Sequence, residues 1–342
     1  MRRLHRPILR AGILFLAASL VGHGVVGARA DAPADATADL AELWIEPETE
    51  RDLYHGPGGV AMAPDPDVRY QVVSVKVGGF SEGYDVRDPS GREWSAKFPP
   101  EASPEVVASR LHWGLGFHQP PIYLLREWHA DGASDPNPQL PARFREEEPD
   151  FHGLQKQDSW AYGDNPFQGT RALAGLLVLQ VMLGNSDLKP SNNSIYTLDE
   201  PREGAGRWYV ARDIGHTFGR TGVFESPRGD VEAYESTGFI RSVEGSRVLL
   251  DYAGRHSELF AEITVDDVRW ICERLARLTE RQWQDAFRAG GYEPATATRF
   301  VRKLTSKISD GLALPAPPSE SPPTSGARAV PADRADTRER QP

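Results

Sequence analysis

Residues 185–193 read NSDLKPSNN, and the interpretation of this stretch decides the fold. Asp187 stands five residues before Asn192, with Lys189 between them. Carboxylate and carboxamide oxygens bind hard metal ions, and an ammonium group pairs with phosphate, so these side chains suit a site that handles both. The same residues also suit a polar turn that ends an apolar segment. The neighbouring sequence distinguishes the two interpretations.

The stretch lies between a predicted buried helix and a predicted hairpin. Before it, TRALAGLLVLQVMLG (170–184) is apolar nearly all round, which is typical of a helix inside a domain. This segment is too short to span a bilayer. After it, SIY (194–196) and RWYVAR (207–212) are short strand candidates joined by a polar loop. The second candidate runs into Asp213-Ile214-Gly215.

The region upstream predicts strands followed by a helix. YQVVSVKVGG (70–79) alternates apolar and polar residues, and the turn sequences GGFSEG (78–83) and DPSG (88–91) lead to REWSAKF (92–98). We therefore expect a three-stranded meander that ends near Lys97, followed by a helix with Glu105 in its first turn. The residues after the hairpin keep helical spacing. These patterns predict an α+β fold with a small strand-rich lobe and one helix, a larger helical lobe, and the polar motifs at their junction.

The two ends of the chain have distinct compositions. Residues 1–30 combine an arginine-rich head, an apolar stretch and Ala28-Arg29-Ala30, which predicts a cleavable signal peptide and a mature protein from about Asp31. An uncleaved membrane anchor is the alternative. Residues 315–342 are rich in Pro, Ser and charge and predict a disordered tail.

Between these ends we expect two parts. Residues 31–126 form a lead-in and the strand-rich N-lobe, and residues 127–314 form the helical C-lobe. Within the C-lobe, residues 129–166 are polar and rich in Pro and Gly, which predicts a long surface insertion.

Composition excludes several classes of protein. The formal net charge of -10 argues against a protein devoted to nucleic-acid binding. Cys272 is the only cysteine, so no intramolecular disulfide is possible, and its apolar neighbours predict a core position. No H-E-x-x-H, G-x-S-x-G or Walker motif is present. Beyond the signal segment, no stretch is long and apolar enough to cross a bilayer.

Five polar residues fit one kind of chemistry. Phosphoryl transfer needs a cation on the nucleotide phosphates, oxygen ligands for Mg²⁺ and a carboxylate near the attacking group. A glutamate that pairs with the cation keeps it charged and oriented. These requirements match a set that strands and helices can bring together: Lys97, Glu105, Asp187, Asn192 and Asp213.

These motifs resemble the protein-kinase-like superfamily. Residues 187–192, DLKPSN, match the catalytic loop D-L-K-P-x-N of protein kinases, and residues 213–215, DIG, resemble the metal-binding D-F-G. Residues 95–98, SAKF, resemble the strand that carries the phosphate-binding lysine. The resemblance implies that Asp187 is the catalytic base, that Lys189 touches the transferred phosphate, and that Asn192 and Asp213 hold the metal. It further implies an ATP site built from a phosphate clamp, its partner and a glycine flap: Lys97, Glu105, Gly78, Gly79 and Gly83.

Several departures indicate a divergent branch. Asn185-Ser186 stand where kinases have His-Arg, the glycines do not follow G-x-G-x-x-G, and no A-P-E follows the DIG. Lys97 and Glu105 are only eight residues apart, so Glu101 is an alternative partner. His216 next to the DIG is either a site residue or a structural one. These features resemble lipid kinases, bacterial toxin-type kinases and secreted or spore-coat kinases.

The sequence thus predicts an exported, kinase-like phosphotransferase that is periplasmic or secreted. It uses ATP with Mg²⁺ or Mn²⁺ and transfers a phosphoryl group, or alternatively a nucleotidyl group, to a hydroxyl of a protein, lipid head group or sugar. Two alternatives stay open. The chain is a pseudokinase that binds a partner without catalysis, or an envelope structural protein in which the loop is a coincidence.

Overall fold

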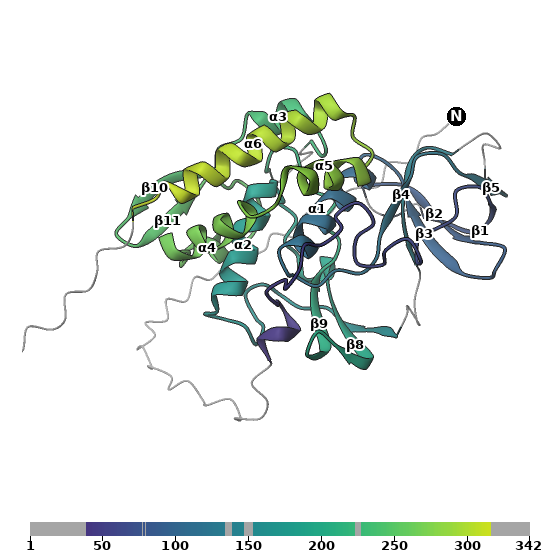
Figure 1. The fold of residues 1–342 in the computed structure, drawn as a ribbon, viewed down its shortest axis with the longest axis horizontal. Helices are drawn as coiled ribbons and strands as arrows, with labels where there is room; N and C mark the ends of the chain where they lie inside the picture. The colour runs from purple at the N-terminus through teal and green to yellow at the C-terminus, as the bar shows by residue number, and fades with distance from the viewer. Residues whose placement is uncertain are drawn as a thin grey trace, which may run out of the picture. The chain divides into compact units, whose positions relative to one another are not determined.

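A computed structural model describes residues 39–76, 78, 80–133, 139–146, 153–222 and 227–315. The predicted signal peptide, Gly79 and all of the predicted tail except Pro315 lie outside these residues. No helix in the described part of the chain is long and apolar enough to cross a membrane. An N-terminal β-sheet is followed by a mainly helical C-terminal part, as Figure 1 shows, which confirms the α+β class.

The N-terminal sheet has six strands in the order β4-β6-β3-β2-β1-β5. Strands β1, β2 and β3 form the predicted antiparallel meander. The sheet strands are β1 (Arg69–Lys76), β2 (Gly83–Arg87), β3 (Glu93–Lys97), β4 (Tyr123–Leu125), β5 (His129–Asp131) and β6 (Ala142–Glu146). Helix α1 (Ala102–Gly114) follows β3 and contacts β4 and β6.

The expected surface insertion at 129–166 is instead partly built into sheets. Strand β5 pairs in parallel with β1, and β6 pairs with β3 and β4. The prediction was wrong because β6 carries two arginines, Arg143 and Arg145, that are mostly buried against a glutamate. A polarity pattern cannot distinguish such paired internal charges from solvent-exposed ones. Farther along, β7 (Leu154–Asp158) pairs with β8 of the C-terminal part.

Aromatic side chains fill one face of the six-stranded sheet. Tyr70, Trp94, Trp128 and Phe144 are nearly fully buried and meet edge to face or tilted, with ring centroids 4.9–6.1 Å apart. Such contacts add to the stabilisation from apolar burial. The aromatic layer therefore gives the strand that ends at Lys97 a rigid support.

Helix α2 (Arg171–Leu183) lies in the centre of the main hydrophobic core, as its apolar sequence predicts. The Thr170 side chain accepts a hydrogen bond from the Leu173 amide at its start, and Gly184 ends the helix in the left-handed conformation that glycine adopts without strain. Helices α4 (Val265–Leu275) and α6 (Pro294–Leu312) contact α2, and α3 (Val231–Glu235) and α5 (Glu280–Ala289) pack on α6. Cys272 is buried on α4, as expected.

Two hairpins complete the C-terminal part. Strands β8 (Asn193–Arg202) and β9 (Ala205–Ala211) pair antiparallel and correspond to the predicted hairpin. A second hairpin joins β10 (Ile240–Glu244) to β11 (Arg247–Leu250). Short 3-10 helices lie at η1 (Leu40–Glu42), η2 (Pro190–Asn192) and η3 (Ser257–Phe260). The NSDLKPSNN stretch thus runs from the end of α2 through η2 into β8.

Candidate functional site

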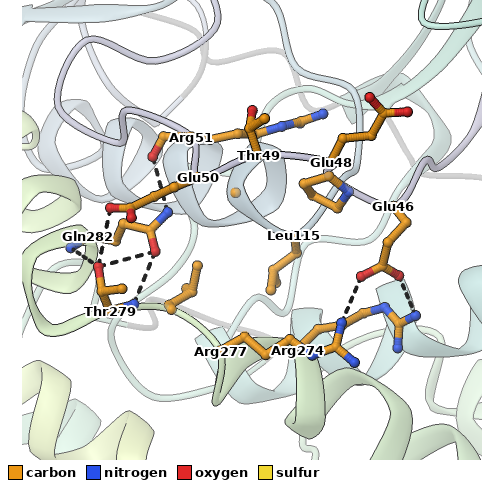
Figure 2. A pocket seen from close by; sticks show the side chains of 13 residues that line it. Glu46, Glu48, Thr49, Glu50, Arg51, Leu115, Arg274, Arg277, Thr279 and Gln282 are labelled. Carbon is orange, nitrogen blue, oxygen red and sulfur yellow. Dashed lines mark hydrogen bonds and ion pairs between the residues drawn. The ribbon is translucent and has the colours of Figure 1, made fainter.

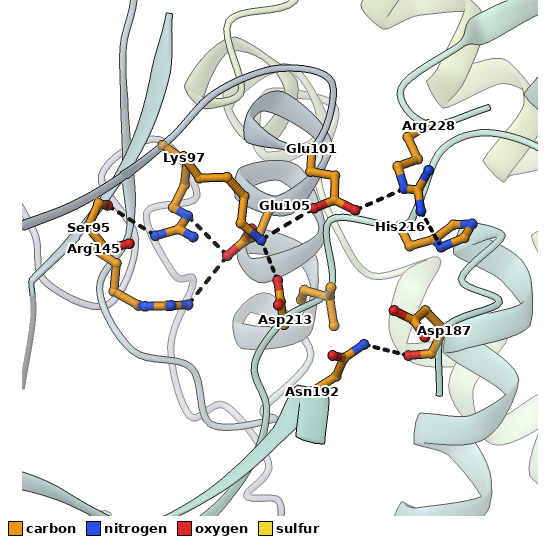
Figure 3. Close-up of polar contacts among 12 residues, drawn as sticks. Ser95, Lys97, Glu101, Glu105, Arg145, Asp187, Asn192, Asp213, His216 and Arg228 are labelled. Atoms are coloured by element: carbon orange, nitrogen blue, oxygen red, sulfur yellow. Dashed lines mark hydrogen bonds and ion pairs between the residues drawn. The ribbon is translucent and has the colours of Figure 1, made fainter. Parts of the chain in front are cut away.

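Lys97 lies at the end of β3 and joins three segments of the chain. Its Nζ is 2.9 Å from Glu105 Oε2 on α1 and 2.5 Å from Asp213 Oδ1 after β9. Figure 3 shows both contacts. The predicted Lys97–Glu105 pair therefore forms, and the structure adds Asp213 to it. Residues from the six-stranded sheet, helix α1 and the segment after the β8–β9 hairpin converge on one ammonium group.

Glu105 is fully buried and is held by two arginines that the sequence analysis missed. Its Oε1 lies 3.1 Å from Arg143 Nε and 3.5 Å from Arg145 Nη1. Arg143 stands opposite Lys97 in the β3–β6 register. Arg143 and Arg145, two residues apart on β6, therefore share the face of the sheet that carries Lys97. The alternation Arg143-Phe144-Arg145 places the two charges on one face of a strand, but the sequence does not show that this face is internal.

Burial opposes ionisation throughout this cluster, but the neighbouring charges prevail. Burial raises the pKa of Glu105, but the Arg143 and Lys97 cations lower it by more, so the net effect is a lowered pKa. The pKa of Asp213 also falls below its usual range, because Lys97 and the arginines outweigh burial. Glu105 and Asp213 together raise the pKa of Lys97 despite its burial. The cluster is thus fully ionised at neutral pH.

Glu101 is a secondary partner of Lys97. Its Oε2 lies 3.5 Å from Lys97 Nζ, against 2.9 Å for Glu105. Its other oxygen, Oε1, lies 2.9 Å from Arg228 Nε. Of the two glutamates weighed from the sequence, Glu105 is therefore the tighter partner, and Glu101 is shared with a second cation.

The β8–β9 hairpin brings the two predicted metal ligands together. Asn193 stands opposite Ala211 at the open end of the hairpin. Asn192 and Asp213, which lie within two residues of this pair, are therefore neighbours. The Asp213 amide donates to Asn192 O at 2.8 Å. The long loop between the motifs in the sequence is therefore the hairpin that closes this site.

Asn192 and Asp213 offer the donors that a hard divalent cation prefers. The Asp213 side chain remains 45% exposed although Lys97 contacts it, so its carboxylate is accessible from solvent. In the described part of the chain no group of three or more His, Cys, Asp or Glu side chains is arranged for a metal. A cation here would be held by Asn192, Asp213 and the phosphates of a ligand, which suits Mg²⁺ because this ion retains few protein ligands.

Asp187 lies beside Asn192 in the loop after α2. Asn192 Nδ2 donates to the Asp187 carbonyl at 2.7 Å, and Lys189 Nζ lies 2.8 Å from Asp187 Oδ2. Burial raises the pKa of Asp187, but the hydrogen bonds from Lys189 and Asn192 outweigh it and lower the pKa below its ordinary value. Asp187 is therefore an ionised carboxylate at neutral pH.

A buried relay that the sequence analysis missed fixes this loop from behind. The Asp187 amide donates to Asn185 Oδ1 at 3.0 Å, and Asn185 Nδ2 donates to Gln180 Oε1 at 2.9 Å. Gln180 Nε2 in turn lies 2.9 Å from His112 Nε2 on α1, and His112 Nδ1 lies 2.7 Å from Ala108 O. Asn185, which marked this loop as divergent, thus links α2 and α1 to Asp187.

The glycines assigned to a phosphate flap have different surroundings. Gly78 is exposed with open space around it, and Gly79 lies outside the described residues. Gly83 is buried in β2, where a Cβ would lie 2.2 Å from Ala96 O. Close approach of β2 and β3 therefore explains Gly83 without a ligand.

A separate cavity of about 300 Å³ lies between residues 46–51 and helices α4 and α5, as Figure 2 shows. Glu46 crosses it and pairs with Arg274 at 2.6 Å and Arg277 at 2.8 Å. Another hollow is lined by Pro190 of η2 together with Trp160 and Tyr209. Neither hollow includes Lys97, Asp187 or Asp213.

The structure thus brings Lys97, Glu105 and Asp213 together and places Asp187 beside Asn192. No protein-family model matches the chain, and no curated protein matches it. Among solved structures, the chain is similar to a crystal structure of a Helicobacter pylori proinflammatory kinase, CtkA. The match has 11% sequence identity and a TM-score of 0.36, and covers 73% of this chain and 100% of that chain.

Proposed function

We propose that this chain is a two-lobed, kinase-like phosphotransferase that uses ATP with Mg²⁺ or Mn²⁺. The observation that carries the proposal is the convergence on Lys97 Nζ of Glu105 and Asp213, from segments far apart in the sequence. A solvated surface lysine has no need for a fully buried glutamate or for two arginines behind it. Such a costly cluster is typical of a functional site.

Each residue then has a task in phosphoryl transfer. Lys97, oriented by Glu105, binds the nucleotide phosphates. Asp187 accepts the proton of an acceptor hydroxyl as its oxygen attacks the γ-phosphorus, and the bond from that phosphorus to the bridging oxygen breaks to release ADP. Lys189 Nζ lies 2.8 Å from Asp187, so its ammonium group is placed to contact the transferred phosphoryl group.

Asn192 and Asp213 are the residues that would hold the metal. When bound, Mg²⁺ or Mn²⁺ supplies positive charge that neutralises the phosphate oxygens. Asp213 pairs with Lys97 in this structure. The pairing keeps the carboxylate ionised and directed into the site, which favours metal binding over protonation.

The acceptor remains a protein, lipid or sugar hydroxyl. A non-catalytic binding module is the alternative, since the Lys97–Asp213 pair would also stabilise a fold that only holds a ligand. We also propose export to the periplasm or outside the cell, on the basis of the signal-like residues 1–30. Sequencing of the mature N-terminus should give a start near Asp31.

Transfer of labelled γ-phosphate from ATP tests the proposal. The full chain is incubated with Mg²⁺ or Mn²⁺ and a panel of protein, lipid and sugar acceptors, with its own phosphorylation recorded. The wild type should transfer phosphate, Asp187→Ala should bind ATP without transfer, and Asp213→Ala should lose the metal response. Binding without transfer in the wild type would instead support the binding module. An Asp187→Ala variant with normal transfer would refute the assignment of the base.

A further inference from the structure

Arg228, in the segment after the DIG, contacts three separate parts of the molecule. Its guanidinium lies 3.5 Å from the centroid of the Phe80 ring, in the turn between β1 and β2. Its Nε lies 2.9 Å from Glu101 Oε1, immediately before α1, and its Nη2 lies 3.0 Å from His216 Nδ1. Figure 3 shows the contacts with Glu101 and His216. The Arg228 side chain is only 8% exposed although Phe80 is 56% exposed.

His216 extends these contacts to the catalytic loop. Its Nε2 lies 3.0 Å from Oγ of Ser186, the residue before Asp187. A guanidinium can only donate, so Nδ1 of His216 accepts, and the proton of the neutral ring is on Nε2. Nε2 therefore donates to Ser186 Oγ. The order Arg228, His216, Ser186 is a directed set of hydrogen bonds that ends next to Asp187.

The charges around His216 keep its ring neutral. Burial and the Arg228 cation lower the pKa of His216 to about 4, with Asp187 acting in the opposite direction and Lys189 in the same one. A neutral ring is required for Nδ1 to accept from Arg228. The hydrogen bonds thus persist through the neutral pH range.

Arg228 also decides how Glu101 affects the lysine. Glu101 lies 3.5 Å from Lys97 with one oxygen and contacts Arg228 with the other. Without Arg228 the Glu101 carboxylate would pair with Lys97 alone and compete with phosphate for its ammonium group. Without Arg228, Phe80 would also lose its contact with the guanidinium. The turn that carries Phe80 leads into β2, which pairs with the Lys97 strand.

We propose that Arg228 and His216 are positioning residues of the phosphotransferase site, with Arg228 holding the Phe80 turn and Glu101, and His216 orienting the catalytic loop through Ser186. This inference rests on the proposed function. It assigns different consequences to the two residues. Arg228 governs nucleotide binding and turnover together, whereas His216 governs turnover, because it links Arg228 to Ser186 of the catalytic loop.

Steady-state kinetics of the full chain with Mg²⁺ and ATP test the inference. Arg228→Met should lower kcat/KM about 100-fold, the loss expected when a reacting group is displaced by about 1 Å. Arg228→Lys keeps the charge near Glu101 but not the planar fork, so it should recover part of the loss in KM and little in kcat. His216→Asn keeps an acceptor for Arg228 but cannot reach Ser186. It should lower kcat about tenfold and leave the KM for ATP within about twofold.

An NMR measurement distinguishes loss of the Arg228–His216 contact from a general loss of stability. The pKa of His216, measured by NMR, should be about 4 in the wild type and should move toward its ordinary value of about 6.5 in Arg228→Met. Arg247→Met, which breaks the exposed pair of Arg247 with Glu262, is the matched control and should keep wild-type kinetics.

The outcomes distinguish this inference from the proposed function. A wild type that neither binds nor transfers phosphate from ATP overturns both. An active wild type, with Arg228→Met and His216→Asn kinetics within about threefold of it, overturns the positioning roles alone. An unshifted His216 pKa in Arg228→Met would contradict the contact itself.

Discussion

Replacement of Glu105 by glutamine should be among the most damaging conservative changes in this molecule. Glu105 is fully buried and its carboxylate meets Lys97 at 2.9 Å, Arg143 at 3.1 Å and Arg145 at 3.5 Å. Lys97 retains Asp213 after the change, but Arg143 is 1% exposed and cannot gain water. Leaving a buried charge without its partner costs about 3–5 kcal/mol. For a chain of this size that corresponds to a fall in Tm of about 6–10 °C.

Urea unfolding followed by tryptophan fluorescence measures this loss. Glu93→Gln is the matched control, since Glu93 lies on β3 and pairs with Arg87 where both side chains are more than 40% exposed. An exposed pair contributes at most about 1 kcal/mol. Equal losses in the two variants would refute the view that Glu105 is the buried centre of the cluster.

Three further predictions concern buried polar groups. Lys307 is buried with its Nζ 2.9 Å from Met182 O, and burial lowers its pKa to about 7, so Lys307→Met should raise the free energy of unfolding by about 1–3 kcal/mol in urea. Burial lowers the pKa of His112 to about 4, so the stability that its neutral form gives above pH 6.5 is lost as the pH falls toward 4. Between pH 7 and pH 4, this group should cost the wild type about 3 kcal/mol of unfolding free energy, and the His112→Gln variant should lack this loss. Asn185→Ala leaves the buried Gln180 Oε1 without its donor and should cost about 1–3 kcal/mol by thermal unfolding.

The meander, the buried helix and the β8–β9 hairpin were predictable because each has a local signal. Alternation and turn residues marked the strands, and Thr170 and Gly184 bounded the apolar helix. The pairing of Lys97 with Glu105 followed from the family resemblance, and the structure places the two side chains in contact.

Long-range polar contacts were not predictable in the same way. Arg143 and Arg145 become internal only because β6 pairs with β3, and pairing of distant strands leaves no mark on local composition. The relay through His112, Gln180 and Asn185 joins two helices to a loop, and each residue alone resembles an ordinary surface polar group. The role of Glu101 likewise depends on Arg228, which lies more than a hundred residues away.

The structure also changes the interpretation of the flap. Gly83 is explained by the close approach of two strands, and Phe80 of that turn lies beneath the Arg228 guanidinium. Motif matching favoured the glycines because it considers spacing alone. The contacts favour an aromatic side chain held by a cation, which a glycine pattern does not reveal.

Calorimetric titration of ATP into the full chain, with and without Mg²⁺ or Mn²⁺, tests the central claim most directly. The site around Lys97 and Asp213 predicts ATP binding that weakens about tenfold or more when the metal is chelated. Asp213→Ala should bind ATP with no dependence on the metal. Absence of ATP binding with either metal, or an Asp213→Ala variant with the wild-type metal dependence, would contradict the account.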